Sequence, residues 1–216
     1  MNDKKKTARI AGVWYLAFII LGAFSIMFVD NNLTISGDAA ATLENLRANT
    51  TLFIFGIIAY IAGYVCFIFV VNNLGKLFKP INNRLTMFMR ITVYTGVAFA
   101  LACKVVQIIA VTASNEKFLT FYETGTAAAV IFWGLWLLPL GLLTLKSNLI
   151  PKILGVLLFG VCAANLADLS IHFLAPNTPE TALNVCYIIE MLGEFGLVLW
   201  LLFKGVKADK MLKYES

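Results

Sequence analysis

The sequence predicts an all-α integral membrane protein: one membrane domain, residues 1–216, built as a bundle of six transmembrane helices. Composition gives the first indication, because the chain is 60% hydrophobic and only 13% charged, whereas soluble domains carry about a quarter charged residues. The second indication is a set of apolar runs near residues 8–29, 51–73, 86–113, 125–146, 152–175 and 181–204. Each run is long enough to cross an apolar core of about 30 Å as a helix, and lipid offers no partner for the backbone of any other structure.

Basic residues give the orientation of the six spans. Fourteen of the 17 Lys and Arg residues fall on one side of a six-span chain: Lys4, Lys5, Lys6, Arg9, Lys76, Lys79, Arg84, Arg90, Lys146, Lys152, Lys204, Lys207, Lys210 and Lys213. Only Arg47 and Lys117 fall on the other side, and Lys104 falls inside a span. The positive-inside rule then predicts that both termini are cytoplasmic and that the chain is a multi-pass protein of the cell inner (cytoplasmic) membrane.

The first span and the loop after it have distinct features. A basic start precedes span one, but its apolar stretch runs to Val29, longer than the core of a signal peptide, so we expect an uncleaved span. In the first outer loop, Asp38 is placed to cap a short amphipathic helix on which Leu43 and Leu46 share a face. That helix is either a plain connector or a lid over an outward-facing cavity.

Polar residues inside the spans are the candidate site, because ionisable groups in lipid are costly and face the bundle interior or a cavity. They form stripes on three helices, since their spacings of three, four and seven residues place them on common faces. The candidate ion- or ligand-binding residues are Lys104 and Gln107 in span three, Asn165 and Asp168 in span five, and Glu190 and Glu194 in span six. His172, near the outer end of span five, is expected to be a solvated interfacial residue.

Depth along ideal helices places three of these side chains in one layer. At 1.5 Å per residue, Lys104 and Glu190 lie about 21 Å from the inner face and Asp168 about 22 Å, while Glu194 lies about 15 Å from it. One lysine therefore faces three carboxylates. We expect Lys104 to pair with Asp168 or Glu190, and the remaining acids to be protonated, hydrated or bound to a cation, because an unpaired charge in lipid is costly.

The same stripes have a purely structural interpretation, in which buried polar groups join helices without binding anything. The excess of acids over bases favours a functional cavity, since a structural contact would be more stable if it were neutral. Aromatic residues support a pocket at the same depth: Tyr60 and Tyr64 lie on one face of span two, and Trp133 and Trp136 on one face of span four. Such rings suit an amphipathic or cationic small molecule, although packing alone also explains aromatic residues in spans. Pro139 is expected to kink span four.

Other chemistries find no support in the residue pattern. The four cysteines lie in apolar runs at unrelated spacings, and the chain has a single histidine, so we expect no disulfide framework, no metal site and no cofactor. The positive charge flanks the apolar runs, which argues against nucleic acid as a partner. No Ser/His pairing, HExxH motif or glycine-flanked acidic pair is present, so we assign no catalytic residues and favour a non-enzymatic role.

Several segments carry a resemblance to a known family: Phe132–Gly141, Lys146–Val156, Gly193–Phe195 and Leu199–Gly205, together with the opening Lys6–Gly12 and the Gly37–Asp38 loop. They resemble the prokaryotic multi-pass membrane family catalogued as domain of unknown function 4386, over nearly the whole chain. The resemblance implies a multi-pass fold without an agreed activity. It also implies acids at Asp168 and Glu194, and a histidine shortly before span four. Here that stretch, Phe121–Gly125, contains no histidine.

Two functions follow from these features. The acid-rich layer favours a proton- or cation-linked protein that binds or transports a small solute. The alternative is a ligand-binding sensor or regulatory membrane module without transport, which the outer-loop helix and a polar cavity would suit. The expected partners are the lipid bilayer and a small molecule or cation. The small residues at 125–129 would also suit a homo-oligomer.

Overall fold

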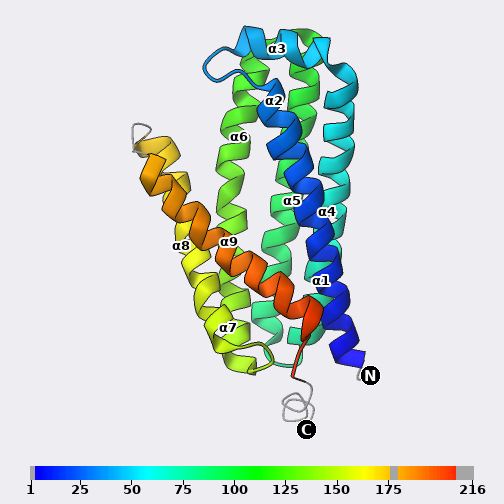
Figure 1. Ribbon diagram of the computed structural model, residues 1–216, viewed down its shortest axis with the longest axis vertical. Coiled ribbons are helices and arrows are strands. Elements are labelled where there is room, and N and C mark those ends of the chain that lie inside the picture. The colour runs from blue at the N-terminus through cyan, green and yellow to red at the C-terminus, as the bar shows by residue number, and fades with distance from the viewer. Residues whose placement is uncertain (1–2, 176–179, 208–216) are drawn as a thin grey trace.

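The computed structural model describes residues 3–175 and 180–207, in which all regular secondary structure is helical. In chain order the elements are α1 (Asp3–Gly22), the π-helix η1 (Ala23–Asp30), α2 (Asn31–Leu33), α3 (Ala39–Ala48), α4 (Thr50–Phe78), α5 (Asn83–Ala113), α6 (Glu116–Leu135), α7 (Leu137–Ser147), α8 (Lys152–Leu174) and α9 (Glu180–Phe203). Figure 1 shows them standing side by side along the long axis, with α3 lying across one end.

The prediction of six membrane-spanning helices is confirmed by length and composition within the described residues. The first span, Asp3–Leu33, combines α1, η1 and α2, and the fourth, Glu116–Ser147, combines α6 and α7. The fourth span begins at Glu116, earlier than its apolar run near residue 125. The reason is that the Asn115 side chain accepts a hydrogen bond from the Lys117 backbone N–H at 3.0 Å and starts the helix there, ahead of the apolar run.

The six spans form a closed ring in which neighbours along the chain are neighbours in space. The first span packs on α4, α4 on α5, α5 on α6, α6 and α7 on α8, and α8 on α9. Packing of α9 against α1 closes the ring. Because every span contacts two others, polar side chains on the inner faces are held within the protein and away from lipid.

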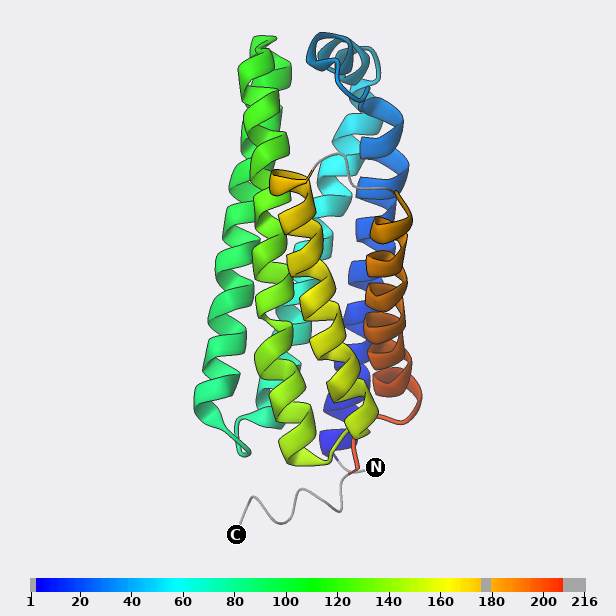
Figure 2. The ribbon, with the colours of Figure 1, turned by 90° about the vertical axis from the view of Figure 1, so that its left-hand side faces the viewer.

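The last helix crosses the ring at an angle. Figure 1 shows α9 running diagonally from the lower part of α1 toward the end of α8. The crossings are close because glycines occupy them. A Cβ at Gly12 would lie 2.8 Å from the backbone nitrogen of Leu202, and one at Gly193 would overlap the Val161 side chain. Figures 1 and 2 also show that α8 and α9 end short of the level of α3. With 23 residues, α8 is about 12 Å shorter than the 31-residue α5.

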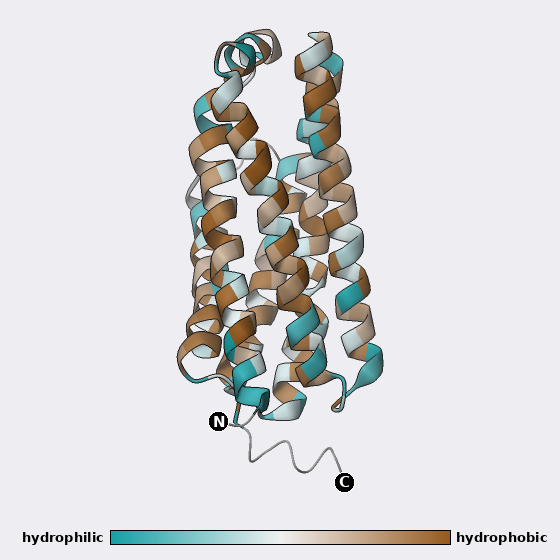
Figure 3. Ribbon diagram, turned by 90° about the vertical axis from the view of Figure 1, so that its right-hand side faces the viewer, coloured by the Kyte–Doolittle hydropathy of each residue, from teal (hydrophilic) through white to brown (hydrophobic). Residues whose placement is uncertain are grey.

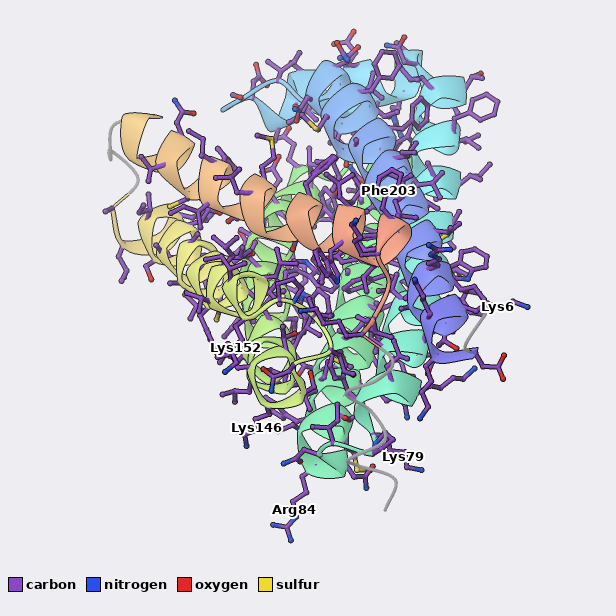
Figure 4. The ribbon with its side chains drawn as sticks, turned by 60° about the horizontal axis from the view of Figure 1, so that its bottom comes forward. Lys6, Lys79, Arg84, Lys146, Lys152 and Phe203 are labelled. Atoms are coloured by element: carbon purple, nitrogen blue, oxygen red, sulfur yellow. The ribbon has the colours of Figure 1, made fainter. Side chains whose placement is uncertain are left out.

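The two ends of the ring differ in charge. One end, here called the basic end, holds the start of α1 and the end of α9. It exposes Lys6, Lys79, Arg84, Lys146 and Lys152, whose side chains point outward in Figure 4. Figure 3 shows polar residues gathered toward the ends of the bundle and apolar residues along its sides. Gathering of the basic residues at one end is what the sequence predicted, and the cytoplasmic location of that end stays a prediction.

The opposite end, here called the α3 end, is covered by the predicted short helix. Its N-terminus is capped as expected, since Asp38 Oδ1 accepts a hydrogen bond from the Ala41 N–H at 2.9 Å. Leu43 and Leu46 are buried beneath the helix, 5% and 1% exposed. Arg47 joins α3 to the end of α5 by donating to the carbonyls of Val111 at 2.7 Å and Thr112 at 3.1 Å.

A break at Trp136 divides the fourth span into α6 and α7. Pro139 has no N–H to donate to the carbonyl of Leu135, so the helical hydrogen bonding is interrupted at this turn, as the sequence predicted. The break places Trp136 fully inside the core, 1% exposed, against Tyr15 and Phe67. This aromatic cluster fills the ring toward the basic end and lines the smaller of the two cavities described next.

Candidate functional site

Two cavities lie inside the helical ring toward the α3 end. The first, here called the acidic compartment, has a volume of about 250 Å³ and is bounded by Tyr15, Tyr64, Trp133, Trp136, Glu190 and Glu194, among others. The second, here called the vestibule, has a volume of about 610 Å³ and is bounded by Asp30, Tyr122, Glu123, Asp168, His172 and Tyr187, among others. Ile26, Tyr60, Tyr64 and Trp133 line both cavities, so the two are adjacent and share one wall.

The shared wall is aromatic. Tyr64 stacks on Trp133 with ring centroids 5.5 Å apart and planes 19° apart, and it meets Tyr60 edge-on at 4.7 Å. A 3.4 Å hydrogen bond joins the two tyrosine hydroxyls. All four aromatic residues predicted to wall a pocket (Tyr60, Tyr64, Trp133 and Trp136) therefore line the acidic compartment. Whether they bind a ligand stays a prediction.

Glu190 and Glu194 of α9 face the acidic compartment. Glu190 and Glu194 are one helical turn apart and only partly exposed. Asn165 of α8 lines the same space, with its amide donating to the Val161 carbonyl at 3.0 Å. Thus Glu190, Glu194 and Asn165, which the sequence proposed as binding candidates, come together in one cavity.

Tyr15 adds a polar group that the sequence analysis did not identify. Its side chain is fully buried and lines the acidic compartment, and its hydroxyl lies beside the Glu194 carboxylate. Within the described residues that hydroxyl makes no hydrogen bond of normal geometry. A buried hydroxyl without a partner is costly, so this position of the cavity is suited to a further polar group.

Lys104 lies behind the shared wall, where its ammonium group is surrounded by partners. Its Nζ donates to Gln107 Oε1 at 2.8 Å, to the Tyr122 hydroxyl at 2.9 Å and to Asp30 Oδ2 at 3.3 Å. It also lies 4.4 Å from the ring centre of Tyr60 and 4.9 Å from that of Tyr122. A lysine has three donors, so all are used, which explains how a side chain that is only 3% exposed is accommodated in the ring.

The expected partner of Lys104 was wrong. The sequence favoured Asp168 or Glu190, whereas the ion pair is made with Asp30. On an ideal helix starting at residue 8, Asp30 lies about 33 Å along the axis and falls outside an apolar core of about 30 Å. In the structure η1 and α2 continue the first helix past Val29, and Asp30, at the end of η1, turns toward α5.

Asp168 belongs to the vestibule instead. It lines that cavity with Asp30, and lies near enough to Glu190 for their charges to interact. Glu123 and His172 also line the vestibule and have exposed side chains, which marks its open side. His172 is therefore exposed, as expected of an interfacial histidine.

Three contributors to the site were missed from the sequence: Asp30, Tyr122 and Tyr15. The signal available for Asp30 was an acid directly after an apolar run. For Tyr122 it was a position eleven residues before Trp133, about three helical turns, which puts both side chains on the same face of span four. For Tyr15 nothing in the pattern separates it from a packing residue. Among the described residues no group of three or more His, Cys, Asp or Glu side chains is arranged to hold a metal ion.

Comparison with known proteins gives one match. The model of a family described as domain of unknown function (DUF4386) matches residues 10–205. Neither the curated proteins nor the solved structures contain a match to the chain.

Proposed function

Since the chain belongs to the DUF4386 family, whose description names no activity, we propose a function from the site itself: the protein binds a small solute inside its helical ring and moves it across the membrane together with protons or a cation. The solute occupies the acidic compartment and reaches it through the vestibule. The chain thus acts as a carrier rather than as an enzyme.

The proposal rests mainly on the position of Glu190 and Glu194. Both carboxylates line a cavity, and neither is paired there with a basic side chain from the described residues. Lys104, the one lysine that is buried in the described part of the chain, already has Asp30 as its ion-pair partner. A structural role accounts for the Lys104–Asp30 pair, which is neutral as a unit and ties α5 to η1. It does not account for two further carboxylates beside about 250 Å³ of space. Such carboxylates suit the binding and release of a proton or cation.

Orientation and membrane are part of the proposal. With fourteen of the 17 basic residues on one side, the positive-inside rule assigns the basic end to the cytoplasm and the α3 end to the outside. The vestibule then opens away from the cytoplasm, and the cytoplasmic membrane of a prokaryotic cell is the proposed location.

The second candidate function is a ligand-binding sensor or regulatory module without transport. It is favoured by the aromatic cluster around Trp136, which closes the cavities toward the basic end. With a single ring of six spans, an opening toward that end requires α9 or the first span to move. The bound solute is the same in both functions. The transport function moves it across the membrane, and the sensor function does not.

Proteoliposomes test the transport function. Purified protein is reconstituted into liposomes that contain dyes sensitive to protons and to Na⁺. A membrane potential is imposed, and the small-molecule fraction of a bacterial extract is added outside as the source of solute. We expect cation uptake above that of empty liposomes, reduced at least about tenfold in Glu190→Gln and Glu194→Gln. The exposed Glu44 of α3 supplies the control, and Glu44→Gln is expected to transport at the wild-type rate.

The alternative has its own readout. Native mass spectrometry of the same preparation detects a small molecule that stays bound during purification. A bound molecule in protein that moves neither cation supports the sensor function. Folded protein without uptake of either cation contradicts cation-linked transport.

A further inference from the structure

We infer that the acidic compartment binds an amphipathic organic cation, specifically a protonated amine on a body about the size of one aromatic ring. The inference rests on the proposed function, for which it names the class of solute. It is carried by the charge, the aromatic lining, the volume and the unpartnered hydroxyl of one cavity.

The charge of the cavity lining indicates that the ligand is positively charged. Glu190 and Glu194 line the acidic compartment, and the described part of its lining contains no Lys, Arg or His. An anion placed there would face two carboxylates without a compensating base. A cation replaces the water or protons that the carboxylates need, because ionisable groups in lipid require a partner.

The aromatic lining decides that the cation is organic. Tyr64 and Trp133 stack in parallel, and Trp136 meets Phe67 edge-on at 5.0 Å. Faces of Trp and Tyr rings attract cations, and the attraction is stronger where water is excluded. A bare metal cation is bound by oxygen atoms and makes little use of ring faces, so the aromatic part of the lining favours an organic cation as the solute.

The protein itself shows how these rings hold an ammonium group. On the other side of Tyr60, Lys104 places its Nζ 4.4 Å from the Tyr60 ring centre and 3.3 Å from the Asp30 carboxylate. A tyrosine face combined with one carboxylate is therefore already in use for an ammonium ion in this ring. The acidic compartment presents the same combination with Tyr64, Trp133 and Glu190, but without a cation belonging to the chain.

Volume sets the size of the ligand. An apolar cavity of about 150 Å³ is large enough for benzene, and the acidic compartment measures about 250 Å³. The remaining space accommodates a short side chain that ends in an ammonium group. The vestibule, at about 610 Å³, is wide enough to admit such a molecule, and Asp168 and Glu123 on its lining favour the passage of a cation.

The buried hydroxyl of Tyr15 favours an amine with N–H groups over a quaternary ammonium. Its side chain has no exposed surface, and its oxygen lacks a partner of normal geometry while lying beside Glu194. A protonated amine at Glu194 donates one hydrogen bond to the carboxylate and a second to the Tyr15 oxygen. A quaternary ammonium has no donor for either acceptor.

Binding of a matched series of small molecules tests this inference. The full chain is placed in nanodiscs of uncharged phosphatidylcholine, and calorimetry measures the binding of 2-phenylethylammonium, its neutral isostere 2-phenylethanol, the anion 3-phenylpropanoate and phenylethyltrimethylammonium. We expect the primary ammonium to bind at least tenfold more tightly than the alcohol, equivalent to about 1.4 kcal/mol. The anion is expected not to bind, and the quaternary cation to be weaker than the primary one.

Variants locate the binding. Glu194→Gln and Glu190→Gln are each expected to weaken the primary ammonium at least tenfold and to leave the alcohol unchanged. Tyr15→Phe is expected to reduce the preference for the primary over the quaternary cation. Glu44→Gln, outside both cavities, is expected to bind as the wild type does.

The ligand series in the wild-type protein decides the inference even if a variant does not fold. Equal binding of alcohol and ammonium, preference for the anion, or no binding by any of the four overturns the assignment to organic cations. Those outcomes leave the proposed function to the proteoliposome measurement, which follows the movement of protons and Na⁺ and supplies solutes of every charge class from an extract. Loss of cation uptake there, with intact binding of the ammonium, contradicts transport and leaves the ligand class standing.

Discussion

At the scale of single residues, Lys104 and the two carboxylates of the acidic compartment differ in whether the protein itself compensates their charge. Lys104 uses all three donors and has a carboxylate partner, so its charge is compensated within the protein. Glu190 and Glu194 have no basic partner in the described lining and border open space instead. Lys104 and its partners are suited to holding the helices of the ring together. Glu190 and Glu194 are suited to binding a solute or cation that enters the cavity.

Removal of Asp30 tests the first of these roles. Asp30→Asn leaves the ammonium of Lys104 buried without its carboxylate, and breaking a buried pair of this kind costs about 3 kcal/mol. The free energy of unfolding, measured by titration with a denaturing detergent in mixed micelles, is expected to fall by roughly that amount. Glu123→Gln, an exposed acid on the same vestibule, is expected to stay within about 0.5 kcal/mol of wild type.

A double variant separates the charge from the packing. Asp30→Asn combined with Lys104→Met removes both partners and keeps an apolar chain of similar length, and such replacements are often neutral. The double variant is expected to recover at least half of the stability lost in Asp30→Asn. A double variant that is less stable than the single one would show that Lys104 contributes by contacts other than this ion pair.

Residue types and helical spacing were sufficient to predict which side chains of α4, α6, α8 and α9 face the interior. They were insufficient to predict the partner of Lys104. The estimate of side-chain depth from residue number assumes that every helix starts at the membrane boundary and has a constant rise per residue. The first span violates both assumptions, because it continues beyond its apolar run and contains the π-helix η1. For that reason Asp30, one residue past the predicted span 8–29, was not among the candidate site residues.

At the scale of helices, the chain depends on close crossings that only glycine permits. A Cβ at Gly12 would lie 2.8 Å from the Leu202 backbone nitrogen, where α9 crosses α1, whereas a Cβ at Gly22 meets nothing within 4 Å. The two glycines lie on the same helix, so they form a matched pair. Since the α1–α9 contact closes the ring, its loss would open the cavities toward lipid.

Gly12→Ala is expected to destabilise the protein by about 1–3 kcal/mol, because α9 must shift to relieve the overlap. Gly22→Ala is expected to be neutral or to stabilise by up to about 1 kcal/mol, through the higher helix propensity of alanine. Detergent denaturation of the two variants measures the difference. Equal stability of both variants would contradict the close packing of α1 on α9.

The helices themselves were largely predictable, because membrane crossing demands long apolar segments and capping residues mark their ends. Asp38 at the start of α3 and Pro139 at the break between α6 and α7 acted as expected. The early start of α6 was missed since its first turns are polar and were assigned to a loop. Gly125, proposed for association between chains, lies against Cys103 of the same chain, where an added Cβ would approach its Sγ to 2.8 Å.

At the scale of the whole molecule, the ring has a charged end, a covered end and a cavity nearer the covered end. If the basic end is cytoplasmic, a membrane-impermeant maleimide added to intact cells is expected to label Glu44→Cys on α3. It is expected to label Arg84→Cys only after the membrane is permeabilised. Both variants are made in a chain whose four cysteines are replaced by alanine, and the reverse pattern of labelling would invert the proposed orientation.

The central claim is that Glu190 and Glu194 face a cavity that cations reach from the α3 end. The most direct measurement is the reaction rate of Glu190→Cys, in the same cysteine-free chain, with two thiol reagents of similar size, one carrying trimethylammonium and one carrying sulfonate. The account predicts that the cationic reagent reacts about tenfold faster or more, relative to its preference at the exposed control Glu44→Cys. It also predicts that 2-phenylethylammonium slows the reaction, at concentrations at least tenfold above those that suffice for the wild-type protein because the Glu190 carboxylate is absent. Equal preference at both positions, or no reaction at position 190 with either reagent, would contradict the claim.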